Sequence, residues 1–258
     1  MNLSIDKLPA GKKIYFASDF HFGAGDKSST DLREKRVVKW LDSIKTDAHA
    51  IFLMGDMFDF WFEYKEVIPK GFIRFQGKLA EITDSGIPIY FFSGNHDMWM
   101  FDYFTKELGI PVFRESQKIT INDKRFFLGH GDGLGPGDGF YKFLKKIFES
   151  KLSHWLFARV HPNLGVGLAN AWSRKSRIGN IESDKGFLGA DEWLLTYCKE
   201  QENIEHHDYY IFGHRHLPLD LEVANNSRYI NLGEWVNYST FAVFDGNDLE
   251  LLDFEKNN

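Results

Sequence analysis

Short, unbroken apolar runs recur along the chain, and each of them closes on small or polar residues. They are KIYFASD (13–19), AIFLMGD (50–56), IPIYFFSGN (87–95), RFFLGHGD (125–132), YYIFGHRH (209–216) and YINLGEW (229–235). Unbroken apolar runs of this length are typical of strands that are buried on both faces. The pattern therefore predicts sheets whose two faces are both covered.

Helical periodicity separates the first three of these runs. We expect one helix from about Asp31 to Lys45 and another from about Phe72 to Asp84. The buried face of the first helix is expected to comprise Leu32, Trp40, Leu41 and Ile44. Strands that alternate with helices are typical of an α/β fold, whereas the C-terminal third reads as consecutive strands with a hairpin around 245–247. We therefore expect two packed sheets with helices outside them.

The stretch from Tyr141 to Asn180 differs in charge from the rest of the chain. It contains eight Lys or Arg residues against one acid, Glu149, within a chain whose formal net charge is -6. An apolar stripe at helical spacing comprises Leu144, Phe148, Leu152 and Trp155. Two interpretations fit: a helix whose stripe joins the core beneath a solvated basic face, or a basic amphipathic cap that meets an anionic, apolar partner.

Composition narrows the class of protein. A chain of 258 residues with 43% hydrophobic content favours one domain with a subdomain insertion. Net negative charge disfavours general nucleic-acid binding, which depends on neutralising phosphates with Lys and Arg, so we expect no nucleic-acid partner. The lone cysteine, Cys198, excludes an intramolecular disulfide and fits a reducing compartment. With no secretory signal and no apolar stretch long enough to span a bilayer, we expect a cytoplasmic protein.

Potential metal ligands follow the first five apolar runs. They are Asp19 and His21, Asp56, Asn95 and His96, His130, and His214 and His216. The carboxyl ends of neighbouring parallel strands meet at one edge, so these side chains are expected to converge there. Carboxylate, imidazole and amide oxygen together suit Mn²⁺, Fe²⁺ or Zn²⁺. The ligands are too numerous for one ion, which favours two ions bridged by Asp56, a centre suited to phosphoryl displacement.

Any one of these motifs alone is weak, because a single histidine after a strand is more often structural. The ordered set D-x-H, G-D-x-x-D, G-N-H-D, G-H-G-D and G-H-x-H resembles the calcineurin-like metallophosphoesterase superfamily. That resemblance implies a four-layer α/β/β/α sandwich with an inserted helical cap. It also implies one metal on Asp19, His21, Asp56 and His216, and a second on Asp56, Asn95, His130 and His214. His96 would then stabilise the transition state or protonate the leaving oxygen, with Asp56 and Asn95 as further catalytic residues.

Within that superfamily, nearly the whole chain resembles the UDP-2,3-diacylglucosamine pyrophosphohydrolases of lipid A biosynthesis. The similar stretches are DFHFG, GDMFDFWF, SGIPIYFFSGNHDMWM, LGHGDGLGPGDGFYKF and GHRHLP. The resemblance implies cleavage of the substrate pyrophosphate to UMP and 2,3-diacylglucosamine 1-phosphate, with Mn²⁺ as the metal. It implies a single domain over 1–258 whose helical cap, at about 139–188, holds the acyl chains.

The same resemblance implies a set of substrate-binding residues, which comprises Asn95, His96, Asp138, Ser173, Arg174, Arg177, Lys185 and His214. The basic, apolar cap further suggests peripheral association with an anionic membrane surface, at the cytoplasmic face of the inner membrane. We expect Asp97 to orient His96. For Met98–Phe101, two interpretations stay open: packing into the core at a helix start, or the floor of an acyl-binding groove.

One departure bears on the substrate. Many members of the lipid A enzyme family have arginine at the position of His96, and histidine is the form of the wider superfamily. A metallophosphoesterase that acts on another soluble phosphodiester or nucleotide is therefore the main alternative. A non-catalytic scaffold is a further alternative, although such a protein would be expected to lose ligands that are all present here.

Overall fold

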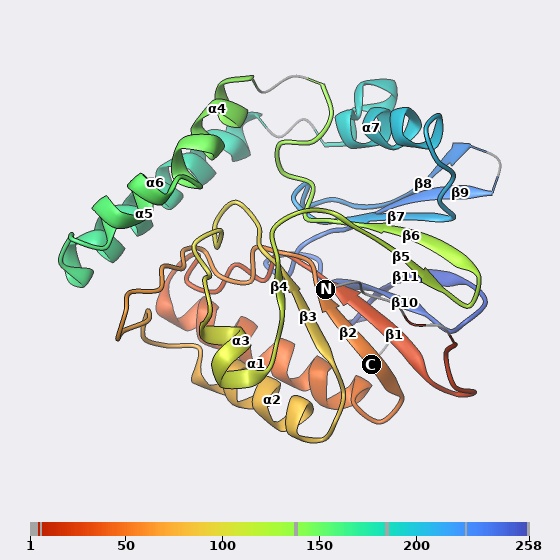
Figure 1. Cartoon of the computed structure of the whole chain (residues 1–258), viewed down its shortest axis with the longest axis horizontal. Coiled ribbons are helices and arrows are strands. Elements are labelled where there is room, and N and C mark those ends of the chain that lie inside the picture. The colour runs from red at the N-terminus through yellow and green to blue at the C-terminus, as the bar shows by residue number, and fades with distance from the viewer. Residues whose placement is uncertain (1–4, 6, 137–138, 184–185, 225, 257–258) are drawn as a thin grey trace.

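Two β-sheets pack face to face in the computed structural model, which describes residues 5, 7–136, 139–183, 186–224 and 226–256 (Figure 1). The first sheet has six strands in the order β11-β10-β1-β2-β3-β4. Its bounds are β1 (Lys13–Ala17), β2 (Ala48–Leu53), β3 (Ile89–Phe92), β4 (Val112–Phe113), β10 (Thr240–Phe244) and β11 (Leu249–Asp253). Strands β1 to β4 are parallel, and β10 pairs with β1 in the antiparallel sense.

The second sheet has five strands in the order β5-β6-β7-β9-β8. Its bounds are β5 (Gln117–Ile121), β6 (Lys124–Leu128), β7 (Tyr209–Phe212), β8 (Pro218–Ala224) and β9 (Ser227–Leu232). Strands β6, β7 and β9 are parallel to one another. Each sheet thus has a parallel centre, whose strands end at the same edge.

Helices cover the outer faces of both sheets. The first sheet is covered by α1 (Lys27–Ile44), α2 (Ile73–Asp84) and α3 (Tyr103–Leu108), and the second by α7 (Trp193–Glu202), which follows the short 3-10 helix η1 (Gly189–Asp191) (Figure 1). This arrangement confirms the predicted four-layer α/β/β/α architecture and the hairpin formed by β10 and β11. Helix α1 begins four residues earlier than predicted, capped by Asp26.

The buried apolar residues divide among three layers. Phe16, Phe52, Phe126 and Ile211 pack between the two sheets, and a second cluster lies between the first sheet and its helices. A third, smaller cluster lies beneath α7. Trp40, Leu41 and Ile44 of α1 are buried as predicted, but Leu32 is 61% exposed, so its assignment to the buried face is wrong.

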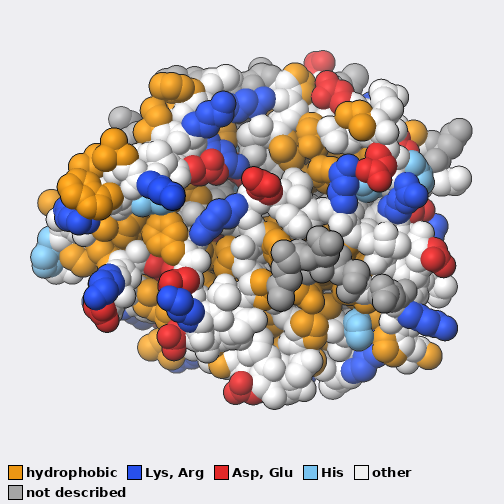
Figure 2. All heavy atoms as spheres, in the orientation of Figure 1, with side chains coloured by type: hydrophobic (Ala, Val, Ile, Leu, Met, Phe, Trp, Pro, Cys, Tyr) orange, Lys and Arg blue, Asp and Glu red, His pale blue; other side chains and the backbone are white. Residues whose placement is uncertain are grey.

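Helices α4 (Gly139–Phe148), α5 (Lys151–Phe157) and α6 (Pro162–Ser183) extend to one side of the sandwich, and we call them the helical arm (Figure 1). The apolar stripe does not join the core, because Leu152 and Trp155 are 65% and 53% exposed. Figure 2 shows apolar side chains on this part of the surface, interspersed with Lys and Arg. No helix formed by the described residues is long and apolar enough to cross a membrane.

Candidate metal centre

The predicted ligands lie together where the strands of both sheets end. Asp19, His21, Asp56 and His216 offer ligand atoms within 4.8 Å of one another, and Asp56, His130 and His214 form a second such group. The Nε2 atom of His21 lies 3.0 Å from that of His216. Asn95 joins the second group, since its Oδ1 atom lies 3.4 Å from His130 Nε2. The two groups share Asp56, as the sequence pattern predicted.

The local backbone of this centre is strained. Positive φ angles, which L-residues rarely adopt, occur at Asp19 (56°), His21 (47°), Asp56 (55°), His214 (66°) and His216 (57°). Each of these residues lies just beyond a strand, where the chain turns sharply. Strain of this kind costs about 1–3 kcal/mol per residue, persists only where the surrounding structure imposes it, and is concentrated at functional sites.

Glycines make room for the ligand side chains. A Cβ atom at Gly94 would collide with the Asp56 carboxylate, and one at Gly213 would collide with the Asp19 carboxylate. A Cβ at Gly55 would likewise meet the His130 ring. The glycines of the G-D, G-N-H and G-H motifs therefore allow the backbone of one strand end to approach the ligand of another.

The donor set fits divalent cations. Within the described part of the chain, Asp19 Oδ1 and Asp56 Oδ2 receive no hydrogen bond, although both atoms are buried. Leaving carboxylate oxygens buried without donors is costly, whereas a bound cation would satisfy them. Buried carboxylate oxygens beside imidazole nitrogens are the ligand chemistry of metals such as Mn²⁺, Fe²⁺ and Zn²⁺.

The ionisable side chains of the centre differ in how readily they would bind a cation. Burial lowers the pKa of His214 to about 4, so this ring is neutral at pH 7 and has a lone pair available. Burial opposes the ionised form of Asp56, but the neighbouring His130 and His96 hold the pKa of Asp56 far below its ordinary value. Burial also opposes the charged form of His130, yet the Asp56 carboxylate raises the pKa of His130 to about 10. A cation that binds there would replace the His130 proton.

His96 lies beside the first group and contacts the helical arm. Its Nδ1 atom lies 3.0 Å from the Asp59 carbonyl oxygen and 3.2 Å from Ser173 Oγ. Burial is the largest cause that lowers the pKa of His96 to about 4. Ser173, which the sequence assigned to the cap, is therefore a buried neighbour of the predicted catalytic histidine.

Asp97 does not orient His96, and that prediction is wrong. Both carboxylate oxygens of Asp97 accept backbone N–H groups, among them those of Gly94 at 2.8 Å and Met57 at 2.7 Å. Asp97 thereby ties the G-N-H-D turn to the G-D turn that carries Asp56. The residue that faces His96 is Asp59, the second aspartate of G-D-x-x-D, whose role the sequence pattern did not predict.

Asp132 also has a role that the sequence pattern did not predict. It is the last residue of G-H-G-D, two positions beyond His130, and its carboxylate is buried. Tyr141 Oη donates to Asp132 Oδ2 at 2.7 Å, and Lys145 Nζ lies 2.7 Å from the same oxygen. Asp132 therefore fastens α4 to the edge of the metal centre. This role could not be predicted from the sequence, because the contact between Asp132 and α4 depends on how the chain turns back after β6.

The remaining predicted substrate residues lie on or near the arm. Arg174 and Arg177 belong to α6, but their side chains are outside the described part of the structure. Asp138 and Lys185 lie outside the described residues altogether. The positions of these four side chains relative to the centre thus stay predictions.

The apolar run after the G-N-H-D motif fits the core-packing interpretation in part, and the acyl-binding floor stays a prediction. Met100 is fully buried among core residues. Trp99 instead faces the arm, donating from Nε1 to the Phe148 carbonyl oxygen at 2.8 Å and packing its ring 4.8 Å from that of Phe157. The run therefore contains one residue that packs in the core, Met100, and one that contacts α4 and α5, Trp99.

Comparison with known proteins agrees with this geometry. The chain is 42% identical over 256 residues to "UDP-2,3-diacylglucosamine hydrolase" of Porphyromonas gingivalis, a match that covers 94% of this chain and 98% of that protein. Proteins of the same name from Shewanella baltica and Edwardsiella ictaluri are 24% and 23% identical, covering 95% and 92% of this chain and 99% and 90% of their own lengths. The model of the calcineurin-like phosphoesterase family matches residues 12–218. The chain therefore belongs to the calcineurin-like phosphoesterase family.

Proposed function

We propose that this protein hydrolyses the pyrophosphate of UDP-2,3-diacylglucosamine, releasing UMP and 2,3-diacylglucosamine 1-phosphate. The observation that carries the proposal is the buried group of Asp and His side chains that shares Asp56. The names of relatives that match over almost their full length indicate the substrate.

Two divalent cations, with Mn²⁺ as our proposal, would be held by the two ligand groups. Asp19, His21 and His216 would hold one ion, Asn95, His130 and His214 the other, and Asp56 would contact both. Bound cations of this kind polarise a phosphoryl group and activate water for in-line attack. The left-handed turns hold the protein ligands in place before any substrate arrives, so little reorganisation is needed during the reaction.

His96 is proposed to act on the substrate directly. Its Nδ1 atom faces the Asp59 carbonyl oxygen, which can only accept, so Nδ1 carries the proton of the neutral ring and Nε2 is free of one. A phosphate that enters the site raises the affinity of the ring for a second proton. The protonated ring would then offset developing charge on the phosphate or protonate the leaving oxygen.

The helical arm is proposed to act as the lid of the site, a cap inserted at about 139–188 in a single domain. Its exposed apolar side chains offer a surface for acyl chains, and its cations suit phosphate. Ser173, Arg174, Arg177, Lys185 and Asp138 are the proposed substrate contacts of this region, together with Asn95, His96 and His214. The same surface is proposed to rest on the anionic cytoplasmic face of the inner membrane.

An assay of the purified protein tests the function. We expect release of UMP from UDP-2,3-diacylglucosamine dispersed in detergent when Mn²⁺ is present, and none after chelation. Parallel reactions with soluble nucleotides and a phosphodiester serve as the comparison. Rapid turnover of a soluble compound without UMP release from the lipid would contradict the substrate and favour the alternative, a phosphoesterase of soluble nucleotides.

A further inference from the structure

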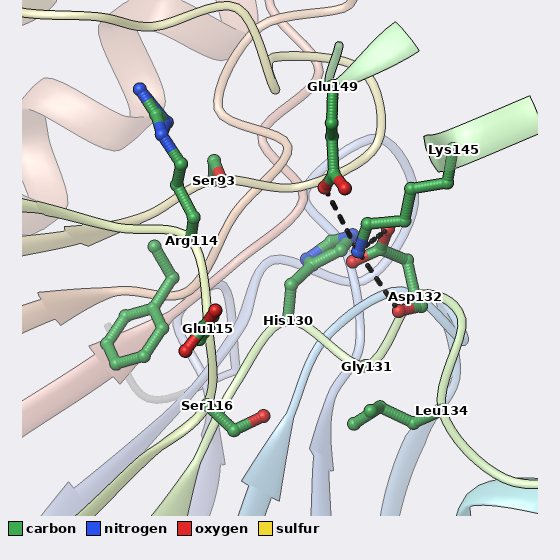
Figure 3. A pocket seen from close by; sticks show the side chains of 11 residues that line it. Ser93, Arg114, Glu115, Ser116, His130, Gly131, Asp132, Leu134, Lys145 and Glu149 are labelled. Carbon is green, nitrogen blue, oxygen red and sulfur yellow. Dashed lines mark hydrogen bonds and ion pairs between the residues drawn. The ribbon is translucent and has the colours of Figure 1, made fainter. Parts of the chain in front are cut away.

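A cavity of about 260 Å³ opens beside His130, at the junction of the two sheets and α4 (Figure 3). Its described lining includes His130 but neither His96 nor Ser173, so it is distinct from the place where the arm covers His96. Arg114, Glu115 and Ser116 lie on one side, and Lys145 of α4 and Glu149, which follows α4, lie on the other (Figure 3). None of these five residues has a role in the proposed function.

The charges of the lining disfavour a second anion site. Lys145 already pairs with Asp132 at 2.7 Å and lies 3.9 Å from Glu149. Arg114 donates to the carbonyl oxygen of Met100. A phosphate placed in the cavity would meet carboxylates whose neighbouring cations are already engaged, and like charges at close range repel each other. The lining therefore suits a ligand that is polar and uncharged.

The polarity of the lining disfavours the acyl chains. An acyl chain in the cavity would displace the water around carboxylates and serine hydroxyls. Because the chain cannot form hydrogen bonds with these groups, their desolvation would cost free energy. The exposed apolar face of the arm provides a better place for such chains.

We propose that this cavity binds the nucleoside of a nucleotide-sugar substrate, an inference that rests on the proposed function. Ribose hydroxyls can donate to the carboxylates of Glu115 and Glu149, and the carbonyl oxygens of a pyrimidine can accept from Ser93 and Ser116. A nucleoside in the cavity places its own 5′-phosphate next to His130, a predicted metal ligand. Cations held by the predicted ligands would activate a water for attack on the phosphate nearer the nucleoside, and this attack would release UMP.

Binding measurements on the metal-loaded full chain test the inference. The probes are UMP, ribose 5-phosphate and inorganic phosphate, titrated by calorimetry in Mn²⁺. UMP is expected to bind at least about tenfold more tightly than ribose 5-phosphate, because only UMP carries the base that the serines contact. Equal affinities of UMP and ribose 5-phosphate would overturn the proposal, and this comparison needs no variant.

A double variant, Glu115→Ala with Ser116→Ala, locates the subsite. It is expected to weaken UMP binding by about tenfold through the lost hydrogen bonds while inorganic phosphate binds as in the unaltered protein. Glu107→Ala, an exposed acid on α3 outside the cavity, is the matched control and should leave UMP affinity unchanged. Unaltered UMP affinity in a folded double variant, or equal losses for UMP and phosphate, would place the nucleoside elsewhere.

Failure of the inference and failure of the proposed function give different results. If the lipid is not the substrate, no UMP is released from UDP-2,3-diacylglucosamine, yet UMP still binds more tightly than ribose 5-phosphate. If the cavity is not the nucleoside site, UMP is released from the lipid and the double variant retains the KM of the unaltered protein.

Discussion

Asp56 has a central position because its two carboxylate oxygens serve different neighbours. Oδ1 accepts the backbone N–H of His96 at 2.8 Å, which fixes the turn that carries the proposed catalytic histidine. Oδ2 lies 3.3 Å from His130 Nε2 and receives no hydrogen bond from the described residues. One side chain therefore couples the predicted metal ligands of two motifs that are distant in sequence.

Replacing Asp56 with asparagine keeps the shape of the side chain and removes its charge. We expect hydrolysis to fall by about 10³-fold or more, because a shared carboxylate is needed to hold both cations. Metal content after gel filtration, measured by mass spectrometry, should fall in the same variant. Full activity with full metal content would rule out a bridging role for Asp56.

Gly94→Ala tests the close approach of the strand ends. The new Cβ would occupy the space of the Asp56 carboxylate, so we expect loss of metal binding and a destabilisation of about 1–3 kcal/mol. Gly77→Ala is the matched control, because Gly77 lies in α2 with open space around its Cβ position. That control should be neutral or stabilise the fold by up to about 1 kcal/mol in urea denaturation. Similar effects of both substitutions would show that crowding at Gly94 is unimportant.

At the scale of elements, the sequence predicts the helices and strands that have a clear hydrophobic periodicity, and the side chains that directly follow a strand. The strands were recognisable because runs such as AIFLMGD are apolar on both faces, and Asp56 and His130 were recognisable because they follow such runs. Contacts made by the arm were not predictable in this way. Asp132 binds α4 only because the chain turns back after β6, and the exposure of Leu32 depends on how α1 rotates on the sheet. The family was recognisable from the motifs, and the family match confirms it.

Trp99 links the turn that carries His96 to the helical arm. Trp99→Phe keeps an aromatic ring beside Phe157 but removes the hydrogen bond to the Phe148 carbonyl oxygen. We expect a KM for the lipid substrate raised by about three- to tenfold with a smaller change in kcat, because a net hydrogen bond contributes about 0.5–1.5 kcal/mol. Tyr238→Phe, which removes a polar group from an exposed aromatic ring outside the arm, is the matched control. Equal KM values for Trp99→Phe and the control would show that Trp99 does not help to position the helical arm.

At the scale of the whole molecule, the centre joins the two sheets. Asp19, Asp56 and Asn95 follow strands of the first sheet, whereas His130 and His214 follow strands of the second. Cations bound by this set would connect both sheets in addition to the apolar core between them. We therefore expect metal binding to stabilise the fold.

Removal of metal tests this linkage. A ligand present at 100 times its Kd stabilises the fold by about 2.7 kcal/mol, so the chelated protein should melt at a lower temperature than the Mn²⁺-loaded protein. Adding Mn²⁺ back should restore the melting temperature, whereas Asp56→Asn should respond much less. Identical melting curves with and without Mn²⁺ would argue against metal ligands drawn from both sheets.

The proposed attachment to membranes depends on exposed cations of the arm. Lys146, Lys151 and Arg159 are exposed, whereas Lys145 is engaged by Asp132. Replacing these three exposed cations with glutamine should weaken binding to vesicles that contain phosphatidylglycerol, by about 1 kcal/mol per charge. Lys35, Lys39 and Lys70, exposed residues outside the arm, provide a control with the same change in net charge. Equal losses in both triple variants, measured by vesicle sedimentation, would exclude the arm as the attachment surface.

The pairing of β1 with β10 also has a consequence for synthesis of the chain. β1 pairs with β2 on one side, but its partner on the other side is β10, which follows every strand of the second sheet. A nascent chain on the ribosome that ends before Thr240 therefore exposes an unpaired edge of β1, a template for association with other chains. The strand that leads to Asp19 and His21 thus gains its second partner only after most of the chain has been made, so chaperone protection during translation would matter at this edge.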